Sequence, residues 1–360
     1  MPIYVKKIDL LFIALFIFFG IAFLGADSGF SIDYKYYIDY ITQVNDLALD
    51  EILDMRIGPY IFLLGSTGIE IAFVFLLKVA TLFSDSAEFV YAVIAMFSLA
   101  IKAFVCRRLG INWLIVLFIL INSAILLEAN ALRSGLSLSI FILSIYKLTN
   151  RRFSLVTIFL WMLATLIHLQ SIFFIIFFGF FYIFSLNHHS KVMTSFYFIG
   201  LMSVGLWLSI MLGLFLNSKL VFYINSDSLS GGFNVVSILS LIIVLFICWT
   251  LIKDSSFRKE NAAIFSAICC TIPALSVYIF LTQVSVVGDR LWQWGLIILL
   301  IFIYPYFPRF KFIGVFMSPR NHIPKILMIL VLSFLIFSTS IRYPLTNIFY
   351  PLIPYQDFTK

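Results

Sequence analysis

Long runs of apolar residues follow one another along almost the whole chain, separated by short polar stretches. An α-helix needs about 20 apolar residues to cross the hydrocarbon core of a bilayer, and most of these runs are close to that length. The pattern predicts eleven membrane-crossing helices, at 8–25, 88–106, 112–128, 132–148, 153–168, 170–186, 193–215, 234–252, 262–281, 291–307 and 325–341. The sequence therefore predicts an all-α, polytopic integral membrane protein.

One further apolar stretch, 57–83, does not fit a simple crossing helix. It is broken by Gly58-Pro59 and by two later glycines, and it carries Glu70 and Lys78. Basic residues concentrate in the cytoplasmic loops of membrane proteins. If the N-terminus is cytoplasmic and 57–83 does not cross, most of the 24 basic residues lie inside and most of the 17 acidic residues lie toward the outside. We therefore expect a re-entrant or interfacial segment, and irregular backbone at membrane depth indicates a site.

Composition excludes a large soluble part. Hydrophobic residues make up 62% of the chain and charged residues 11%, against roughly 45–50% and 25% in globular proteins. We expect one transmembrane domain, 1–360, with outer loops at 26–56 and 216–233. The net charge of +7 is explained by the loops between spans, so no nucleic-acid partner is expected.

The sequence contains no motif for a metal ion, a nucleotide or another cofactor. Its four cysteines lie in or at the ends of apolar runs, without the spacing of a zinc site or a disulfide framework. They are expected to be small buried side chains. Neither a Rossmann-like element nor a P-loop is found, so we expect no metal and no cofactor.

Four ionisable residues remain inside or beside the spans once the basic helix ends on the cytoplasmic side are set aside. They are Glu70, Arg133, His168 and Arg290. Ionisable groups in membrane segments are costly and by default mark a functional site. The predicted topology places all four at or near the outer side. Their convergence from distant segments predicts a site there.

Each of these residues also has a purely structural interpretation. The two arginines could face phospholipid headgroups, and Arg290 could pair with its neighbour Asp289 or with another acidic loop residue. Glu70 could pair with Lys78 or Arg56, and His168 could simply form a hydrogen bond across helices.

The order of the polar elements resembles a known family. An outer segment rich in Asp and Tyr follows the first helix; then come a Glu-bearing apolar segment, an Asn-x-x-Arg element, a helix that ends in His, and a late Arg. These elements are Asp27 with Asp33-Tyr34-Lys35-Tyr36-Tyr37, Glu70, Asn130 to Arg133, His168 and Arg290. The order resembles the EpsG/Wzy-type polysaccharide polymerases over most of 8–300.

Three positions depart from the pattern of that family. Ile71-Ala72 follow the Glu where Pro-Gly is common, Ser134 follows the Arg where Gln is common, and Gln170 stands two positions after the His where Ser is common. These departures concern the individual roles expected of Glu70, Arg133 and His168 more than the resemblance to the family.

The resemblance implies a membrane glycosyltransferase that uses polyprenyl-diphosphate-linked oligosaccharides at the outer face of the bacterial inner membrane. Its expected partners are those substrates, membrane lipids and a chain-length regulator. On this basis His168, Glu70 and Asp33 are the candidate catalytic residues, and Arg133 and Arg290 are expected to bind the diphosphate. The candidate substrate-binding residues are Asp27, Tyr36, Tyr37, Asn130 and Asp289.

Two other functions remain open from the sequence. A flippase for lipid-linked oligosaccharides would carry ionisable groups through the depth of its cavity and show repeats between its halves. An O-antigen ligase would share the donor site and present a larger outer loop between its late helices. A polymerase agrees best with the short loops and with charges that gather toward one face.

Overall fold

The computed structural model describes residues 7–24, 33–54, 61–64, 67–150, 153–186, 260–274 and 285–304, together with residues 245, 248 and 251. These residues form mainly helices, so the predicted helical class is confirmed. The predicted spans 193–215 and 325–341, nearly all of 234–252 and the outer loop 216–233 lie outside the described residues. The count of eleven crossings stays a prediction.

The described elements follow one another in a simple order. The first are α1 (Lys7–Leu24), α2 (Tyr34–Asp46), α3 (Leu49–Asp54), β1 (Ile61–Leu64), β2 (Thr67–Glu70) and α4 (Ile71–Thr81). Then come α5 (Ala87–Arg108), α6 (Trp113–Ser123), the π-helical turn η2 (Ala124–Glu128), α7 (Leu132–Asn150), α8 (Leu155–Ile167) and α9 (Ser171–Leu186). The last are α14 (Ala262–Cys269) and α16 (Ser285–Ile303).

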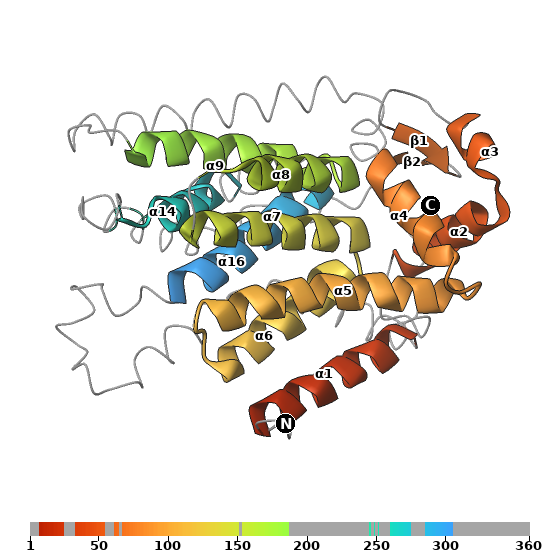
Figure 1. The fold of residues 1–360 in the computed structure, drawn as a ribbon, viewed down its shortest axis with the longest axis horizontal. Coiled ribbons are helices and arrows are strands. Elements are labelled where there is room, and N and C mark those ends of the chain that lie inside the picture. Colours follow the sequence, from red (N-terminus) through yellow and green to blue (C-terminus); the bar gives the residue numbers. More distant parts are fainter. Residues whose placement is uncertain are drawn as a thin grey trace, which may run out of the picture.

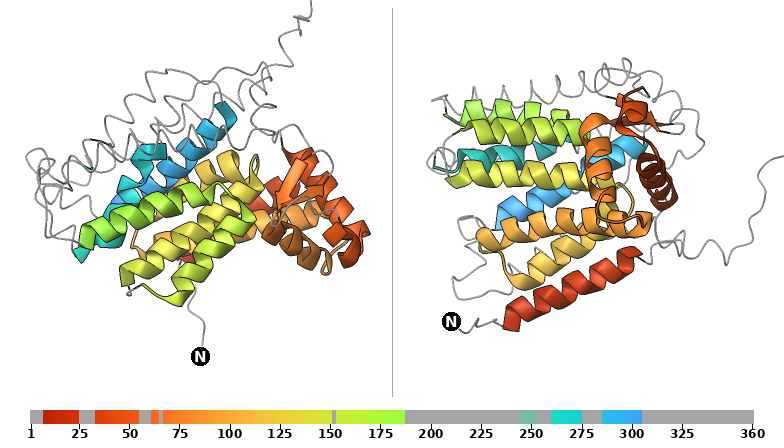
Figure 2. Two further views of the ribbon diagram at one scale, coloured as in Figure 1. Left: turned by 90° about the horizontal axis from the view of Figure 1, so that it is seen from above. Right: turned by 45° about the vertical axis from the view of Figure 1, so that its right-hand side comes forward.

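The helices α5, α7, α8 and α9 run side by side, and α2, α3, α4 and the two strands gather at one end of this bundle (Figures 1 and 2). We call this end of the bundle the hairpin end. Both α5 and α7 start near the hairpin end and run away from it (Figure 1). Their last turns carry Arg107, Arg108 and Lys147, so these basic residues lie toward the opposite end.

The stretch 57–83 contains an antiparallel hairpin, which the sequence did not predict. β1 pairs with β2 in a register that joins Ile61 to Glu70 and Leu64 to Thr67. The helix that follows, α4, has 11 residues, or about 16 Å at 1.5 Å per residue, which is short for a hydrocarbon core of about 30 Å. The prediction of an irregular segment is consistent with this geometry, but the all-α description misses the small sheet.

Two helices, α2 and α3, occupy part of the stretch that was expected to be an outer loop. The buried residues of α2 are Tyr34, Tyr37, Tyr40, Ile41 and Val44. Their spacing of three and four places them on one face of the helix, which packs against the bundle.

The longest apolar helix, α5, has clear signals at both ends. The Ser86 side chain accepts a hydrogen bond from the Phe89 amide at its start, as a helix N-cap does. At its end, Gly110 has φ of +70°, and the amide of Ile111 donates to the Cys106 carbonyl at 3.1 Å. This is a Schellman ending, for which glycine is the favoured residue.

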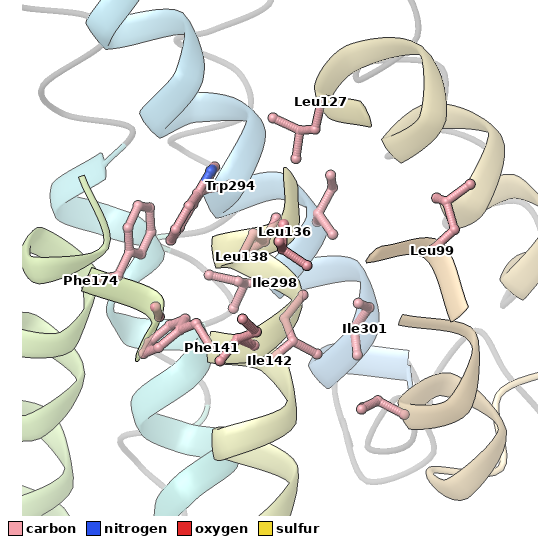
Figure 3. Packing of buried hydrophobic residues seen from close by; sticks show 14 of the residues in the cluster. Leu99, Leu127, Leu136, Leu138, Phe141, Ile142, Phe174, Trp294, Ile298 and Ile301 are labelled. Carbon is pink, nitrogen blue, oxygen red and sulfur yellow. The ribbon is translucent and has the colours of Figure 1, made fainter. Parts of the chain in front are cut away.

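One part of the buried core lies between α7, α9 and α16, with Leu99 of α5 and Leu127 of η2 beside it (Figure 3). Trp294 is fully buried, its ring stacks on Phe174 with centroids 5.0 Å apart, and its Nε1 donates to Ser134 Oγ at 2.7 Å. The hydrogen bond satisfies the indole N–H inside an apolar core. This packing fixes α16 beside the first turn of α7.

Among the described residues, one helix, Ala87–Arg108, is long and apolar enough to cross a membrane by length and composition alone, with a mean hydropathy of 2.2. Six described apolar segments are shorter: Ile71–Thr81, Trp113–Ser123, Leu155–Ile167, Ser171–Ser185, Ala262–Ala274 and Arg290–Ile303.

Candidate functional site

The carboxylate of Glu70 joins three segments at the hairpin end. It stands between β2 and α4, as the N-cap residue of α4. Arg133 Nη1, from the first turn of α7, donates to Glu70 Oε2 at 2.6 Å. His168 Nδ1 lies 3.3 Å from Glu70 Oε1, and the Leu169 amide donates to the same oxygen at 3.3 Å. Residues that are 63 and 98 positions apart from Glu70 thus meet at one carboxylate.

A second ion pair lies close to the first. Arg290 Nη2 donates to Asp33 Oδ2 at 3.0 Å, across 257 residues of sequence. It joins the start of α2 to α16. The side chains of Arg290 and Asp33 are 22% and 28% exposed, against 13% for those of both Arg133 and Glu70. Both guanidinium groups are therefore largely buried, and each binds a carboxylate.

Tyrosines of α2 and α5 form an aromatic layer next to these ion pairs. Tyr37 is buried and within hydrogen-bonding reach of the Arg133 side chain, and its ring lies 6.1 Å from those of Tyr91 and Phe73. The Tyr91 hydroxyl donates to the carbonyls of Glu128 and Ala129, at 2.9 and 2.8 Å. The aromatic layer thus contacts both α2 and the connection that leads into α7.

The electrostatic surroundings shift the pKa values of the two carboxylates in opposite directions. Burial raises the pKa of Glu70, but Arg133 and the hydrogen bond from His168 outweigh it and hold that pKa well below its usual value. Burial raises the pKa of Asp33, and the charges of Arg290 and Arg133 offset this only in part. Glu70 is therefore an anion over the whole physiological range, whereas Asp33 takes up a proton more readily than an ordinary aspartate.

The protonation of His168 follows from its partners. In a neutral imidazole one ring nitrogen carries a proton and the other a lone pair. An ionised carboxylate can only accept, so Nδ1 carries the proton. Nε2 then has a lone pair, and the Gln170 Oε1 position lies 3.1 Å from it. The amide group of Gln170 has to turn its NH₂ toward Nε2 to donate to it.

This backbone geometry explains why His168 is available at the site. It is the C-cap of α8 with an extended conformation, φ −156° and ψ 114°, and α9 begins three residues later at Ser171. The helix ends there and projects the imidazole toward Glu70. Gln170, which stands where the family pattern commonly has Ser, contacts the histidine directly.

The described part of the chain contains no group of three or more His, Cys, Asp or Glu residues that could hold a metal ion. All four cysteines are free and buried.

A family model named EpsG family matches residues 10–356, nearly the whole chain. The chain belongs to the EpsG family. The predicted resemblance is thereby confirmed, and membership indicates a polymerase-like role in membrane polysaccharide synthesis. No curated protein and no solved structure matches the chain.

The other candidate residues of this EpsG family member lie in different surroundings. Tyr36 is 57% exposed on α2. Asn130 Nδ2 donates to the Ile125 carbonyl at 2.7 Å, within the turn before α7. Asp27 and the side chain of Asp289 lie outside the described residues. A role of these four residues in substrate binding stays a prediction.

One structural interpretation of Glu70 is wrong, because Lys78 has other partners. Its Nζ donates to the carbonyls of Val44, Asn45 and Leu47 at 3.0, 3.2 and 2.7 Å. These carbonyls lie at the C-terminal end of α2, where a cation is favourable. Lys78 therefore holds α2 against α4.

A buried ion pair between Lys102 of α5 and Glu128 of η2 was not among the predicted site residues. Both side chains are fully buried. The signal was present, since each charge lies inside a predicted span, at 88–106 and 112–128. A charge within an apolar run is by itself a reason to expect a partner.

Proposed function

We propose that this EpsG family member is a polymerase of O-antigen, capsule or exopolysaccharide repeat units. It transfers the growing glycan from polyprenyl diphosphate to a lipid-linked repeat unit at the outer face of the bacterial inner membrane. The observation that carries the proposal is that Glu70 holds both Arg133 and His168 at the hairpin end, beside the pair of Arg290 and Asp33.

The chemical step is a single displacement with inversion. A hydroxyl oxygen of the incoming unit forms a bond to the anomeric carbon of the growing chain. The bond from that carbon to the diphosphate oxygen breaks, and polyprenyl diphosphate leaves with the electron pair. The hydroxyl proton goes to a general base.

His168 is the base that the geometry favours. Its neutral imidazole holds a proton on Nδ1, toward Glu70 Oε1, and a lone pair on Nε2. Glu70 fixes this tautomer and stabilises the imidazolium that forms, as the carboxylate of a catalytic triad does. Gln170 covers Nε2, so the acceptor hydroxyl takes the place of its amide at that nitrogen.

The two arginines suit the leaving group. The diphosphate gains negative charge as the bond breaks, and contacts that strengthen with that charge lower the barrier. A guanidinium has five N–H donors, so an arginine held by one carboxylate oxygen can still bind phosphate oxygens. Arg133 also lies in the first turn of α7, where the helix dipole favours an anion. Arg290 is the sixth residue of α16, one turn further from its helix start.

Asp33 and the tyrosines of α2 are assigned supporting roles. Asp33 orients Arg290, and Tyr37 packs against Arg133 from the side of α2. Tyr36, which is exposed, offers a flat ring for contact with a sugar.

The surface polysaccharide of a strain that lacks the gene tests the proposal. A polymerase deletion leaves single repeat units on the surface acceptor, and the wild-type gene restores the ladder of longer chains. Two outcomes would contradict the proposal. Lipid-linked units that accumulate inside the cell indicate a flippase, and loss of all glycan from the acceptor indicates a ligase.

A further inference from the structure

The buried pair of Lys102 and Glu128 lies at the centre of a closed polar network. Glu128 Oε1 accepts from Lys102 Nζ and from Ser98 Oγ at 2.7 Å, and Glu128 Oε2 accepts from Ser123 Oγ at 2.9 Å. Lys102 Nζ also contacts Ser98 Oγ at 3.3 Å and donates to the Gly135 carbonyl at 3.1 Å. Every charged group of the pair has partners, so the network specifies one arrangement of its helices.

A buried ion pair is weak evidence for stability, because desolvation offsets most of the attraction. Its position indicates another role. The network holds the connection into α7 from both sides: Tyr91 holds the carbonyls of Glu128 and Ala129, and Lys102 holds that of Gly135. Arg133 lies between these anchored points. The π-helical turn that ends at Glu128 is of a kind found often at functional sites.

Gly135 is the residue that allows this close approach. A Cβ added to Gly135 would lie 2.9 Å from Glu128 Oε1 and 3.3 Å from Leu127 Cβ. The chain also offers a control, since a Cβ added to Gly179, within α9, would meet nothing within 4 Å.

We propose that Lys102, Glu128 and Gly135 form a positioning unit for Arg133. The unit sets the depth and rotation of the first turn of α7, and through it the place of the guanidinium against Glu70 and the donor diphosphate. None of the three residues touches substrate. The inference rests on the proposed function, because chain extension is its readout.

The test compares Gly135→Ala with Gly179→Ala, each supplied to a strain that lacks the gene, at matched protein level in the membrane. A misplacement near 1 Å can cost about a hundredfold in rate, so we expect Gly135→Ala to slow chain extension about tenfold to a hundredfold. Gly179→Ala should extend chains at the wild-type rate. Equal rates for the two variants would overturn the proposal.

A second comparison separates positioning from a loss of general stability. If the network acts through Arg133, the fold-loss caused by Gly135→Ala should shrink in an Arg133→Lys background, where the planar fork is already lost. The same fold-loss in both backgrounds would overturn the proposal and assign the network a structural role only.

Ser98→Ala provides the same test if Gly135→Ala fails to reach the membrane. It removes one donor to Glu128 without leaving a charge unpaired, and Ser185→Ala, whose hydroxyl donates to the nearby Tyr182 carbonyl, is its control. A rate for Ser98→Ala equal to that of Ser185→Ala would contradict the inference. If deletion of the gene leaves chain length unchanged, the proposed function itself fails. If deletion abolishes extension but these variants match their controls, the inference alone fails.

Discussion

At the scale of single residues, the Glu70 carboxylate has two roles: it pairs with an arginine and it holds the candidate base. One oxygen binds Arg133, and the other faces His168 and the Leu169 amide. The sequence could predict that Glu70, Arg133 and His168 lie near one face, because each is a costly group in an apolar setting. It could not predict that one carboxylate serves both partners, since the pairing depends on how α4, α7 and α8 pack.

Replacement of Glu70 by Gln should slow chain extension about a hundredfold or more, because the amide neither fixes the His168 tautomer nor stabilises an imidazolium. The measurement is the polysaccharide ladder at matched protein level in the membrane. Asp39→Asn, at an exposed position of α2, is the control and should give a normal ladder. A normal ladder from Glu70→Gln would make Glu70 a structural residue.

The pH dependence of chain extension follows from the protonation of His168. The base must be neutral, so activity should fall as the imidazole takes up a proton, near the ordinary imidazole pKa of about 6.5. In Glu70→Gln the imidazolium loses its anionic partner, so the residual activity should fall at a lower pH than that of the wild-type protein. The same midpoint for both proteins would exclude His168 as the base.

At the scale of elements, the apolar pattern predicts the bundle helices closely. The expected spans 88–106 and 132–148 correspond to α5 at Ala87–Arg108 and α7 at Leu132–Asn150, because a continuous apolar run has one favourable solution in a bilayer. The pattern fails for α2 and for the hairpin of β1 and β2. α2 has a single apolar face and is too short to cross, and the hairpin is a short apolar segment that its glycines divide.

The contact between Lys78 and the end of α2 yields a prediction at this scale. Lys78→Met removes three hydrogen bonds to carbonyls and should loosen α2. Val44 is fully buried. A cysteine placed there should react with a thiol reagent in the Lys78→Met protein, and it should stay protected in the protein that keeps Lys78. Lys35→Met, at an exposed position of α2, should leave the cysteine protected. Equal protection in both variants would refute a capping role for Lys78.

At the scale of the whole molecule, the basic ends of α5 and α7 and the candidate site lie toward opposite ends of the bundle (Figure 1). The distribution of charge along the sequence could predict this polarity. It could not predict that α2 and α16 meet through Asp33 and Arg290, because a contact across 257 residues leaves no local pattern. The pair of Lys102 and Glu128 left a local signal for each charge but none for the partner.

The sidedness of the bundle can be measured with a thiol reagent that does not cross membranes. Tyr36→Cys, at the hairpin end, should be labelled in intact spheroplasts. Arg107→Cys, at the exposed end of α5, should be labelled only after the membrane is permeabilised. The native cysteines are buried, so the background is low. The opposite result would place the candidate site in the cytoplasm and refute the outer-face assignment.

The central claim is that this protein joins lipid-linked glycans without a further energy source. The reaction takes place at the site formed by Arg133, Arg290, Glu70 and His168. The most direct measurement is chain extension by the purified protein in liposomes that contain only polyprenyl-diphosphate-linked repeat units. We predict longer glycans together with released polyprenyl diphosphate from the wild-type protein, extension slowed about 30-fold to 1,000-fold in Arg133→Ala, and a smaller loss in Arg133→Lys. Loss of one such charge-assisted contact should raise the barrier by about 2–4 kcal/mol. Full extension by Arg133→Ala, or none by the wild-type protein, would contradict the account.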